Sequence, residues 1–475
     1  MPAYKVTYFN IVGLGGPIRF LLSYVGVEFE DIRIEHSNWP EAKPKTPFGQ
    51  VPTLEIDGKV YYQTLPICRY LAKQFNLLGK SDLDALEIDA VANTVHDLRK
   101  MVSLYFFEQD SAEKAKKKET LVTTTLPFYL KRLDDVVKKN GGYFHGGELS
   151  YADLFFAAVQ HNIKGFMKND VFEDYPNLKQ LIDKVHALPR IAAWLAKSPK
   201  TDYSSRLVRY DSSSALKIGP KFSLFRINRV EGWVRAGLVR LVIRKFRYLR
   251  YFNLTSDKNT KMPQYKLIYF KTTGVAELVR YLFSYADQDF EDVRHDITTW
   301  PKFQRETPYG VLPLLEIDGK VYNQSLAIGR YLAKEFNLTG SNKLEDLEID
   351  SMVDTINDYR SVFSQYLWEA NKIAKSKRKE QLVQEKLPFY LNRFEDRVKA
   401  NGGYFVGGKL TWADLWFVSL KPYLDFVIGF DTLKNHAALT EHANKINAIP
   451  NIKKWLDTRP TECCLQEFLD AKQQD

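Results

Sequence analysis

Cysteine and histidine are scarce in this chain, which has 3 cysteines and 8 histidines among 475 residues. Cys68, Cys463 and Cys464 form no CxxC pair, and their spacing fits neither a zinc site nor a disulfide framework. Cys68 lies in an apolar helical stretch and is expected to be a core residue. The sequence therefore predicts reduced thiols and no metal site.

Long hydrophobic runs are also missing. No apolar run reaches the roughly 18 residues that a membrane-spanning helix needs, and the first residues lead into a strand pattern rather than a signal peptide. With 45% hydrophobic and 14% aromatic residues, the chain can still bury large cores. We expect a cytoplasmic protein.

The excess of positive charge is confined to one region. The formal net charge is +10, but residues 203–261 contain 14 Lys and Arg against Asp211, Glu231 and Asp257. Nucleic-acid binding cannot be argued from the global charge, and no nucleic-acid partner is expected. Residues 224–254 interleave arginines with apolar residues at helical spacing. This pattern fits a tether, an amphipathic helix in weak contact with an anionic membrane surface, or a contact with another partner.

What the chain does contain is a duplication. From Met1 to about Asp202 the sequence is matched without a gap by residues 261 positions further on, so that Tyr8 falls on Tyr269. A repeat of about 200 residues is far longer than a solenoid unit, and each copy is expected to be a globular body with its own core. We call the two copies the first half and the second half, and residues that match between them counterparts.

Each half shows two kinds of pattern. Short strand-like and helical runs alternate over about eighty residues, an order that predicts a βαβαββα domain. Its strands and helices are expected at 4–10, 18–25, 28–34, 53–56, 59–62 and 65–75. The rest of each half predicts helices, which in the first half cover 84–107, 112–139, 151–167, 177–186 and 191–196. The fold class is therefore an α+β domain followed by an all-α domain, present twice.

Two helix starts are marked by a local motif. Ser150-Tyr-Ala-Asp153 and Thr411-Trp-Ala-Asp414 each place a hydroxyl three residues before a carboxylate, ahead of an apolar run. This is a capping-box pattern with Asp in place of Glu or Gln. Both aspartates are therefore expected to have a structural role.

Four strings together carry a family resemblance. They are Tyr4-Lys-Val-Thr-Tyr8-Phe9-Asn10, Trp39 with Thr46-Pro47-Phe48-Gly49-Gln50-Val51-Pro52, Gln63-Thr64-Leu65-Pro66-Ile67-Cys68-Arg69-Tyr70-Leu71-Ala72, and Ser150-Tyr151-Ala152-Asp153. In this order and spacing, each half resembles a sigma-class glutathione transferase. The resemblance implies a thioredoxin-like N-terminal domain with a cis-proline, a helical C-terminal domain, and a dimer. The domains are expected at 1–79, 81–202, 262–340 and 342–475, with a basic linker at 203–261.

The chemistry of such an enzyme depends on ionising a thiol. A thiol with a pKa near 8.5 is only about 3% thiolate at pH 7, and lowering that pKa by about two units is a stabilisation of roughly 2.7 kcal/mol. The resemblance implies that Tyr8 and Tyr269 are catalytic and donate a hydrogen bond to the glutathione sulfur. Glutathione is then a co-substrate, and no permanently bound cofactor is expected.

The resemblance also implies the other glutathione contacts. The backbone before the cis-proline would pair with the cysteinyl amide, and a helix start would suit the γ-glutamyl carboxylate. An aspartate from the partner half would reach the glutamyl amine, although an ordinary exposed helix acid stays an alternative. The expected residues are Tyr8, Trp39, Lys43, Gly49, Gln50, Val51, Pro52, Gln63, Thr64 and Asp97 in the first half, and Tyr269, Trp300, Gln304, Leu312, Pro313, Gln324, Ser325 and Asp358 in the second.

The second half is the weaker match. Gln304 replaces Lys43 and Val311 replaces Gln50, which removes a charge and a side-chain amide. We expect weaker glutathione binding there. In the first half Met101, Leu104 and Tyr105 are candidates for an electrophile pocket, with core packing as the alternative.

The sequence predicts a glutathione transferase that conjugates the thiolate to small hydrophobic electrophiles, with hydroperoxide reduction as a further candidate activity. The alternatives are a non-catalytic S-crystallin-like structural or ligand-binding relative and a glutathione-dependent prostaglandin isomerase. The isomerase is disfavoured because Val12-Gly13-Leu14 stands where many sigma-class members have Arg-Gly-Arg, and because Asn93 and His96 replace acidic residues. A coil of 59 residues spans roughly 40 Å, so the halves are expected to pair within one chain, with a homodimer of chains as the alternative.

Overall fold

The computed structural model describes residues 2–199, 265–369 and 371–460. The expected linker at 203–261, with its basic segment 224–254, lies outside the described residues. Cys463 and Cys464 lie outside them as well.

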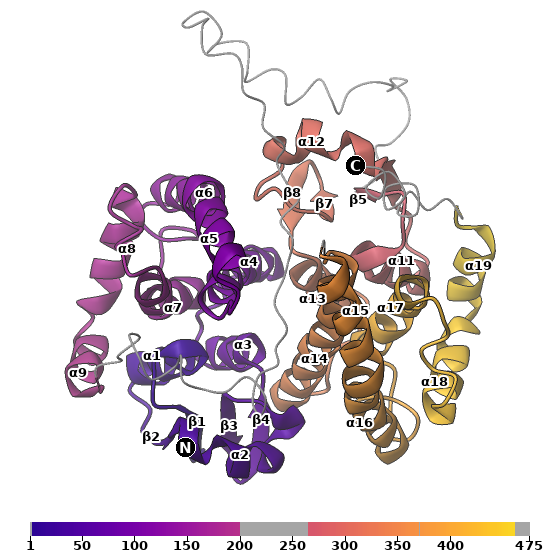
Figure 1. Cartoon of the computed structure of the whole chain (residues 1–475), viewed down its shortest axis with the longest axis horizontal. Coiled ribbons are helices and arrows are strands. Elements are labelled where there is room, and N and C mark those ends of the chain that lie inside the picture. The colour runs from indigo at the N-terminus through magenta and orange to yellow at the C-terminus, as the bar shows by residue number, and fades with distance from the viewer. Residues whose placement is uncertain (1, 200–264, 370, 461–475) are drawn as a thin grey trace, which may run out of the picture.

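The first half begins with a four-stranded sheet of strand order β2-β1-β3-β4, in which only the β1–β2 pair is parallel. Its elements are β1 (Tyr4–Phe9), α1 (Gly16–Val25), β2 (Phe29–Ile34), α2 (Trp39–Ala42), β3 (Thr53–Ile56), β4 (Lys59–Tyr62) and α3 (Thr64–Gln74). Helices α1 and α3 pack together between the sheet and the helical domain (Figure 1). The thioredoxin-like domain that the sequence predicted is confirmed.

A helical domain follows, made of α4 (Asp82–Phe106), α5 (Ser111–Thr120), α6 (Leu126–Lys139), α7 (Tyr151–Met167), α8 (Pro176–His186) and α9 (Pro189–Lys197). Helix α7 is buried along most of its length and packs on α4 and α1. The helical stretch predicted over 112–139 is present, and α5 and α6 continue into each other through a π-helical turn at Leu121–Thr125. Pro127, the second residue of α6, has no N–H for a regular helical bond back to this turn.

The second half repeats this order, with a sheet of order β6-β5-β7-β8. Its elements are β5 (Tyr265–Phe270), α11 (Glu277–Tyr285), β6 (Glu291–His295), α12 (Trp300–Phe303), β7 (Leu314–Ile317), β8 (Lys320–Asn323), α13 (Ser325–Glu335), α14 (Lys343–Leu367), α15 (Lys372–Gln381), α16 (Leu387–Ala400), α17 (Trp412–Ile428), α18 (Ala437–Asn447) and α19 (Pro450–Thr458).

The two predicted capping boxes are present at the starts of α7 and α17. Asp153 also accepts a hydrogen bond from the backbone N–H of Phe144 at 2.8 Å, and Asp414 accepts one from Phe405 at 2.9 Å. Each aspartate therefore ties the preceding loop to its helix. The structural role predicted for both is confirmed.

The halves pack against each other through the sheet domain of one and the long helix of the other. Helix α3 lies on α14, and α13 lies on α4 (Figure 1). Basic residues of the sheet domains meet acidic residues of the long helices in ion pairs that join Lys59 to Glu348, Lys73 to Asp346, Lys320 to Glu87 and Lys334 to Asp82. The contact between the halves is therefore electrostatically complementary in both directions.

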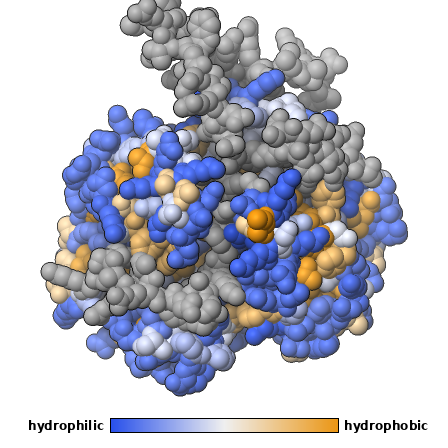
Figure 2. Space-filling view, in the orientation of Figure 1, coloured by the Kyte–Doolittle hydropathy of each residue, from blue (hydrophilic) through white to orange (hydrophobic). Residues whose placement is uncertain are grey.

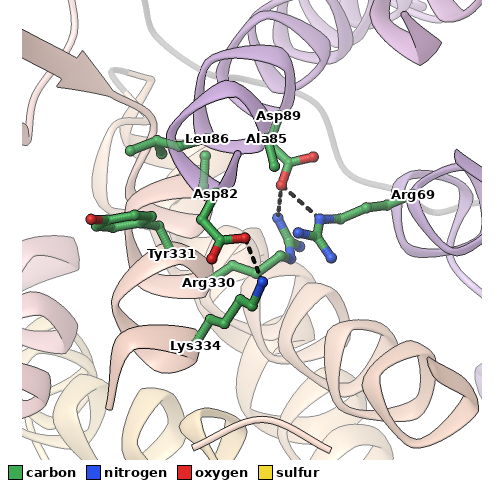
Figure 3. A pocket seen from close by; sticks show the side chains of 9 residues that line it. Arg69, Asp82, Ala85, Leu86, Asp89, Arg330, Tyr331 and Lys334 are labelled. Carbon is green, nitrogen blue, oxygen red and sulfur yellow. Dashed lines mark hydrogen bonds and ion pairs between the residues drawn. The ribbon is translucent and has the colours of Figure 1, made fainter. Parts of the chain in front are cut away.

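Two arginines and two aspartates form the centre of this contact. Arg69 Nε lies 2.7 Å from Asp89 Oδ2, and Arg330 Nε lies 3.0 Å from Asp350 Oδ2. Arg330 also reaches Asp89, at 3.4 Å from its Nη1. A small cavity is lined by Arg69, Asp89 and Arg330 together with the Lys334–Asp82 pair (Figure 3). Arg69 Nη1 also lies 3.8 Å from Asp350 Oδ2, so each arginine is close to a carboxylate of both halves.

In the ranges that the structure describes, no helix combines the length and the apolar character needed to cross a membrane. On the face shown in Figure 2, hydrophobic residues lie in small groups among hydrophilic ones.

Candidate functional site

Three candidate residues of the first half lie together where three neighbouring strands of its sheet begin or end. Thr7 of β1 pairs with Thr53 of β3, which pairs with Tyr62 of β4, so these residues form one row across three strands. The residues next to this row, on the same side of it, are Tyr8, Pro52 and Gln63. The Val51–Pro52 peptide bond is cis, as is Leu312–Pro313 in the second half. The strand register therefore brings together three of the predicted positions.

The loop after β1 holds the Tyr8 hydroxyl. The hydroxyl oxygen accepts a hydrogen bond from the backbone N–H of Leu14 at 3.1 Å, and the side chain is only 7% exposed. A hydroxyl that accepts one hydrogen bond is polarised and becomes a better donor. Its own proton remains to be donated to a ligand.

Two glycines make room for this phenol. Gly13 has φ +42°, and a Cβ atom there would lie 2.5 Å from the Tyr8 hydroxyl oxygen. A Cβ atom on Gly15 would lie 2.7 Å from the Tyr8 ring. Sequence reasoning gave neither residue a role, although the Gly-x-Gly spacing directly after a strand was the available signal.

The buried side chain of Arg19 holds the same loop in place. The Arg19 guanidinium lies 5.9 Å from the centre of the Tyr8 ring and has no exposed surface. It donates to the Asp31 carboxylate at 2.8 Å and to the backbone carbonyl of Ile11 at 2.9 Å. Arg19 therefore ties the loop after β1 to α1 and β2. The sequence pattern gave no sign of it, because an arginine among apolar helical residues usually points to solvent.

Trp39 and Val51 belong to the same small cluster as Tyr8. Phe9 lies between Tyr8 and Trp39, with ring centroids 5.5 Å and 5.2 Å away, and Val51 packs against the group. The Lys43 side chain lies against Gly49, where an added Cβ would be 3.2 Å from Lys43 Cε. Gln50, which follows Gly49, is half-buried.

Gln63 connects the first site to the second half. It precedes α3 with a left-handed backbone at φ +70°, and Thr64 begins the helix as a buried residue. The Gln63 side-chain amide donates to Asp358 Oδ2 at 3.0 Å and to Thr355 Oγ1 at 3.3 Å. Asp358 of the second half, rather than Asp97, therefore borders the first site.

The second site has the reciprocal contact. The Gln324 side-chain amide donates to Asp97 Oδ2 at 3.0 Å and to Thr94 Oγ1 at 3.2 Å. Burial raises the pKa of the Asp97 carboxyl, and the hydrogen bond from Gln324 opposes this shift. Ser325 begins α13 in the place of Thr64.

The surroundings of Tyr269 differ from those of Tyr8. Burial raises the pKa of Tyr269 to about 12, although the Val275 N–H donates to its oxygen. Ala276 stands where the first half has Gly15, so the Tyr269 ring cannot take the same place relative to its loop. Trp300 remains in contact with Phe270, at 5.4 Å between ring centroids. The Gln304 amide donates to the carbonyl of Gly310, two residues before Leu312, at 3.3 Å.

The electrophile-pocket candidates Met101, Leu104 and Tyr105 lie half-buried on α4. Met101 and Tyr105 pack against the first-half core, and the Lys114 ammonium lies 5.8 Å from the centre of the Tyr105 ring. These contacts agree with the core-packing alternative.

The structure also bears on the thiols and metals. Cys68 is fully buried in the first-half core, and burial raises the pKa of its thiol well above the usual value. The prediction of a core residue is confirmed. Within residues 2–199, 265–369 and 371–460, no group of three or more His, Cys, Asp or Glu side chains is placed to hold a metal ion.

Family models match both halves at corresponding positions. The model described as glutathione S-transferase, N-terminal domain, matches residues 4–73 and 265–334. The model described as glutathione S-transferase, C-terminal domain, matches residues 96–198 and 357–459. The matched regions therefore follow the duplication.

Curated relatives match one half at a time. A glutathione S-transferase of Anopheles gambiae is 41% identical over 202 residues, which are 42% of this chain and 100% of the relative. A hematopoietic prostaglandin D synthase of Gallus gallus is 38% identical over 201 residues, which are 42% of this chain and 99% of the relative. The solved structure of prostaglandin synthase D of Nilaparvata lugens is 42% identical and covers 42% of this chain and 100% of its own, with a TM-score of 0.41. The chain belongs to the glutathione S-transferase family, with the domain pair of that family present twice.

Proposed function

We propose that the first half is a sigma-class glutathione transferase site that conjugates the glutathione thiolate to small hydrophobic electrophiles. The observation that carries this proposal is the Tyr8 hydroxyl, which accepts the Leu14 N–H at 3.1 Å at the sheet edge beside the cis Val51–Pro52 bond. Its remaining proton is free to point at a bound sulfur.

In this proposal Tyr8 donates its O–H to the glutathione sulfur and keeps it ionised, while the thiol proton leaves to solvent. The thiolate then attacks the electrophile, forms a C–S bond, and expels the leaving group with its electron pair. One well-directed donor to a developing anion is worth about 10²-fold in rate. Reduction of a hydroperoxide would use the same thiolate, which attacks the terminal oxygen and breaks the O–O bond, so that glutathione becomes a sulfenic acid and the alkoxide takes a proton from solvent to leave as the alcohol. A second glutathione thiol would then attack the sulfenic sulfur, forming glutathione disulfide and releasing water.

The tripeptide would lie along the residues that border Tyr8. The Val51 backbone would pair with the cysteinyl amide, and the first N–H groups of α3 at Gln63 and Thr64 would hold the γ-glutamyl carboxylate. Asp358 would hold the glutamyl amine. Trp39 and Lys43, with Gly49 and Gln50 in the adjoining loop, would bind the glycyl end. Met101, Leu104 and Tyr105 remain our candidates for the electrophile pocket.

The second half would bind glutathione more weakly. Its residues would be Tyr269, Trp300, Gln304, Leu312, Pro313, Gln324 and Ser325, with Asp97 from the first half. Two observations support the difference. The Gln304 amide is engaged by its own loop, and Ala276 carries a methyl group at the position of Gly15, which the Tyr8 ring approaches closely in the first half.

We further propose that the halves pair within one cytoplasmic chain, with domain boundaries at 79–81, 202–203, 261–262 and 340–342. The support is the set of ion pairs that joins α3 and β4 to α14, and α13 and β8 to α4. Light scattering should give one species near the chain mass of 55.1 kDa. Exclusive formation of chain dimers would contradict the closed monomer.

The activity is tested with glutathione and a chlorodinitrobenzene, following the thioether product. A thiolate band in the ultraviolet difference spectrum of the glutathione complex should appear in the parent chain and disappear in Tyr8→Phe. The absence of both product and band would favour a non-catalytic binding protein. The names of several relatives make prostaglandin endoperoxide isomerisation a second candidate, which product analysis with that substrate would test.

A further inference from the structure

The two halves insert unlike aromatic side chains into each other. Phe48, in the loop before β3, lies 6.0 Å from Phe394 and 6.5 Å from Tyr390 of α16, between ring centroids. Its counterpart Tyr309, in the loop before β7, stacks on Tyr129 of α6 at 6.3 Å and an interplanar angle of 19°. We call Phe48 and Tyr309 the two knobs.

The surfaces that receive the knobs also differ. In the second half, Phe394 is surrounded by rings, with Tyr359 at 5.6 Å and Tyr390 at 5.9 Å between centroids. In the first half, leucines replace two of these three rings. The first-half receiving surface is Leu98, Tyr129 and Leu133, and the second-half receiving surface is Tyr359, Tyr390 and Phe394. The first-half surface therefore has less side-chain volume and accommodates a larger and deeper knob.

The two knobs are buried to different extents, and the deeper one contacts the surface with the smaller side chains. Tyr309 is 6% exposed and forms part of the first-half core. Phe48 is only half-buried, and it also rests on Tyr62 of its own half, 5.6 Å away. The counterpart of Tyr62 is Asn323, which provides no such ring. The larger knob thus enters the less crowded surface, and the smaller knob rests on the crowded one.

The backbone conformations of the two knob loops also differ. Phe48 has a left-handed backbone with φ +49°, which is uncommon for a bulky residue. The Tyr309 loop is instead held against α6, where Arg132 Nη2 donates to the carbonyl of Arg305 at 2.9 Å. A Cβ atom on Gly310 would lie 2.9 Å from the Phe128 ring. Gly49 is the counterpart of Gly310, so the two loops share this glycine and differ in the backbone conformation of the knob itself.

We propose that these two unequal knob contacts make each half recognise the other and disfavour the pairing of two identical halves. Pairing of two second halves would bring the Tyr309 hydroxyl against the three-ring surface on which Phe48 now packs. Pairing of two first halves would leave Phe48 above the leucine surface with an unfilled gap. Both mismatches weaken a packed contact. The partner is the other half of this chain, and this pairing places Asp358 at Gln63 and Asp97 at Gln324.

Carbodiimide cross-linking of the full chain followed by mass spectrometry tests which halves pair. This reagent joins lysines and carboxylates that are in contact. The expected products join Lys59 to Glu348 and Lys320 to Glu87, which are ion pairs between unlike halves. Products that join Lys59 to Glu87, or Lys320 to Glu348, come from identical halves and would overturn the proposal if they matched the expected ones in yield.

A double-mutant cycle tests whether the knobs cause the selectivity. Phe48→Tyr adds a hydroxyl to the crowded contact, and Phe394→Leu opens a gap beneath Phe48. Each change alone should make hydrogen exchange in α3 and α14 about tenfold faster, whereas the pair, which recreates the Tyr–Leu combination, should return within about threefold of the parent. Exchange in α7 and α17, inside the two halves, reports whether each half stays folded.

Two outcomes of the cycle would overturn the proposal. One is unchanged exchange in Phe48→Tyr, a loop substitution that leaves both cores intact. The other is an additive effect in the double variant. The matched control is Tyr309→Phe, which removes an atom rather than adding one and should change exchange in α13 by less than about threefold.

Discussion

Gln63 of the first half donates its side-chain amide to Asp358 of the second half at 3.0 Å, so that each candidate site is bordered by both halves. The reciprocal pair of Gln324 and Asp97 has the same distance. A residue remote in the sequence therefore becomes part of a site through pairing of the halves. Glutathione binding in the first half should depend on a carboxylate in the second.

Asp358→Asn should raise the KM for glutathione about tenfold in the first half, because the neutral amide no longer pairs with the glutamyl ammonium. The turnover number should change much less, since Asp358 is not at the sulfur. Initial rates at varied glutathione concentration give both values. Asp97→Asn is the matched control, and a larger loss in that variant than in Asp358→Asn would contradict the assignment.

Tyr8→Phe should lower kcat/KM for conjugation about 100-fold, because it removes the one donor aimed at the sulfur. Tyr269→Phe should lower it by less than about twofold, since the second half contributes little of the turnover. Both variants keep the ring that packs beside Phe9 or Phe270, so stability should hold. Equal losses in the two variants would show that the sites are equivalent.

Gly15→Ala should lower kcat about tenfold or more, because a Cβ atom 2.7 Å from the Tyr8 ring forces the phenol to move. Its hydrogen bond with the Leu14 N–H would then be lost or misdirected. The thermal unfolding midpoint should fall only slightly. The reciprocal change, Ala276→Gly, should leave the first site unaffected, and an unchanged kcat in Gly15→Ala would show that the ring position is not critical.

The sequence predicted most of the fold because its signals are local. Strand alternation, helical periodicity and the Ser150–Asp153 capping box depend on residues close together in the chain, and the structure has each of them. The π-helical turn between α5 and α6 was not predicted, because it keeps the helical periodicity almost intact.

The site was only partly predictable for the opposite reason. Matching strings gave Tyr8, Pro52 and Gln63, and the strand register brings these together. Arg19 was missed because its role depends on Asp31 and the Ile11 carbonyl, which no sequence spacing links. The knobs Phe48 and Tyr309 were missed because their partners lie in the other half, and contacts between bodies leave no periodic pattern.

Lys43→Gln should raise the KM for glutathione about threefold to tenfold, because it removes the charge offered to the glycyl carboxylate. Gln304→Lys should strengthen binding to the second half, although the gain is smaller since the Gln304 amide also bridges to Gly310. Calorimetric titration of each variant with glutathione measures both changes. Identical affinities in Lys43→Gln and the parent would remove Lys43 from the site.

The stability contributed by one ion-pair group between the halves should depend on pH, whereas the stability contributed by the counterpart group should not. His145 Nε2 lies 3.2 Å from Asp84 Oδ1, and its Nδ1 lies 3.5 Å from Glu87, which also pairs with Lys320 of the second half. The hydrogen bond to Glu87 raises the pKa of His145. In the other group Glu348 pairs with Lys59 and, at 3.4 Å, with Arg397, which stays charged throughout.

A histidine whose pKa is raised on folding adds stability that is complete below its unfolded value of about 6.5 and is lost as the pH rises through its folded value. His145→Gln should therefore lower the Tm by about 1–2 °C at pH 6 and leave it unchanged at pH 9. Arg397→Gln should lower the Tm equally at both values. Calorimetric melting across this range checks the pair, and a pH-independent loss in His145→Gln would show that its charge does not stabilise the contact.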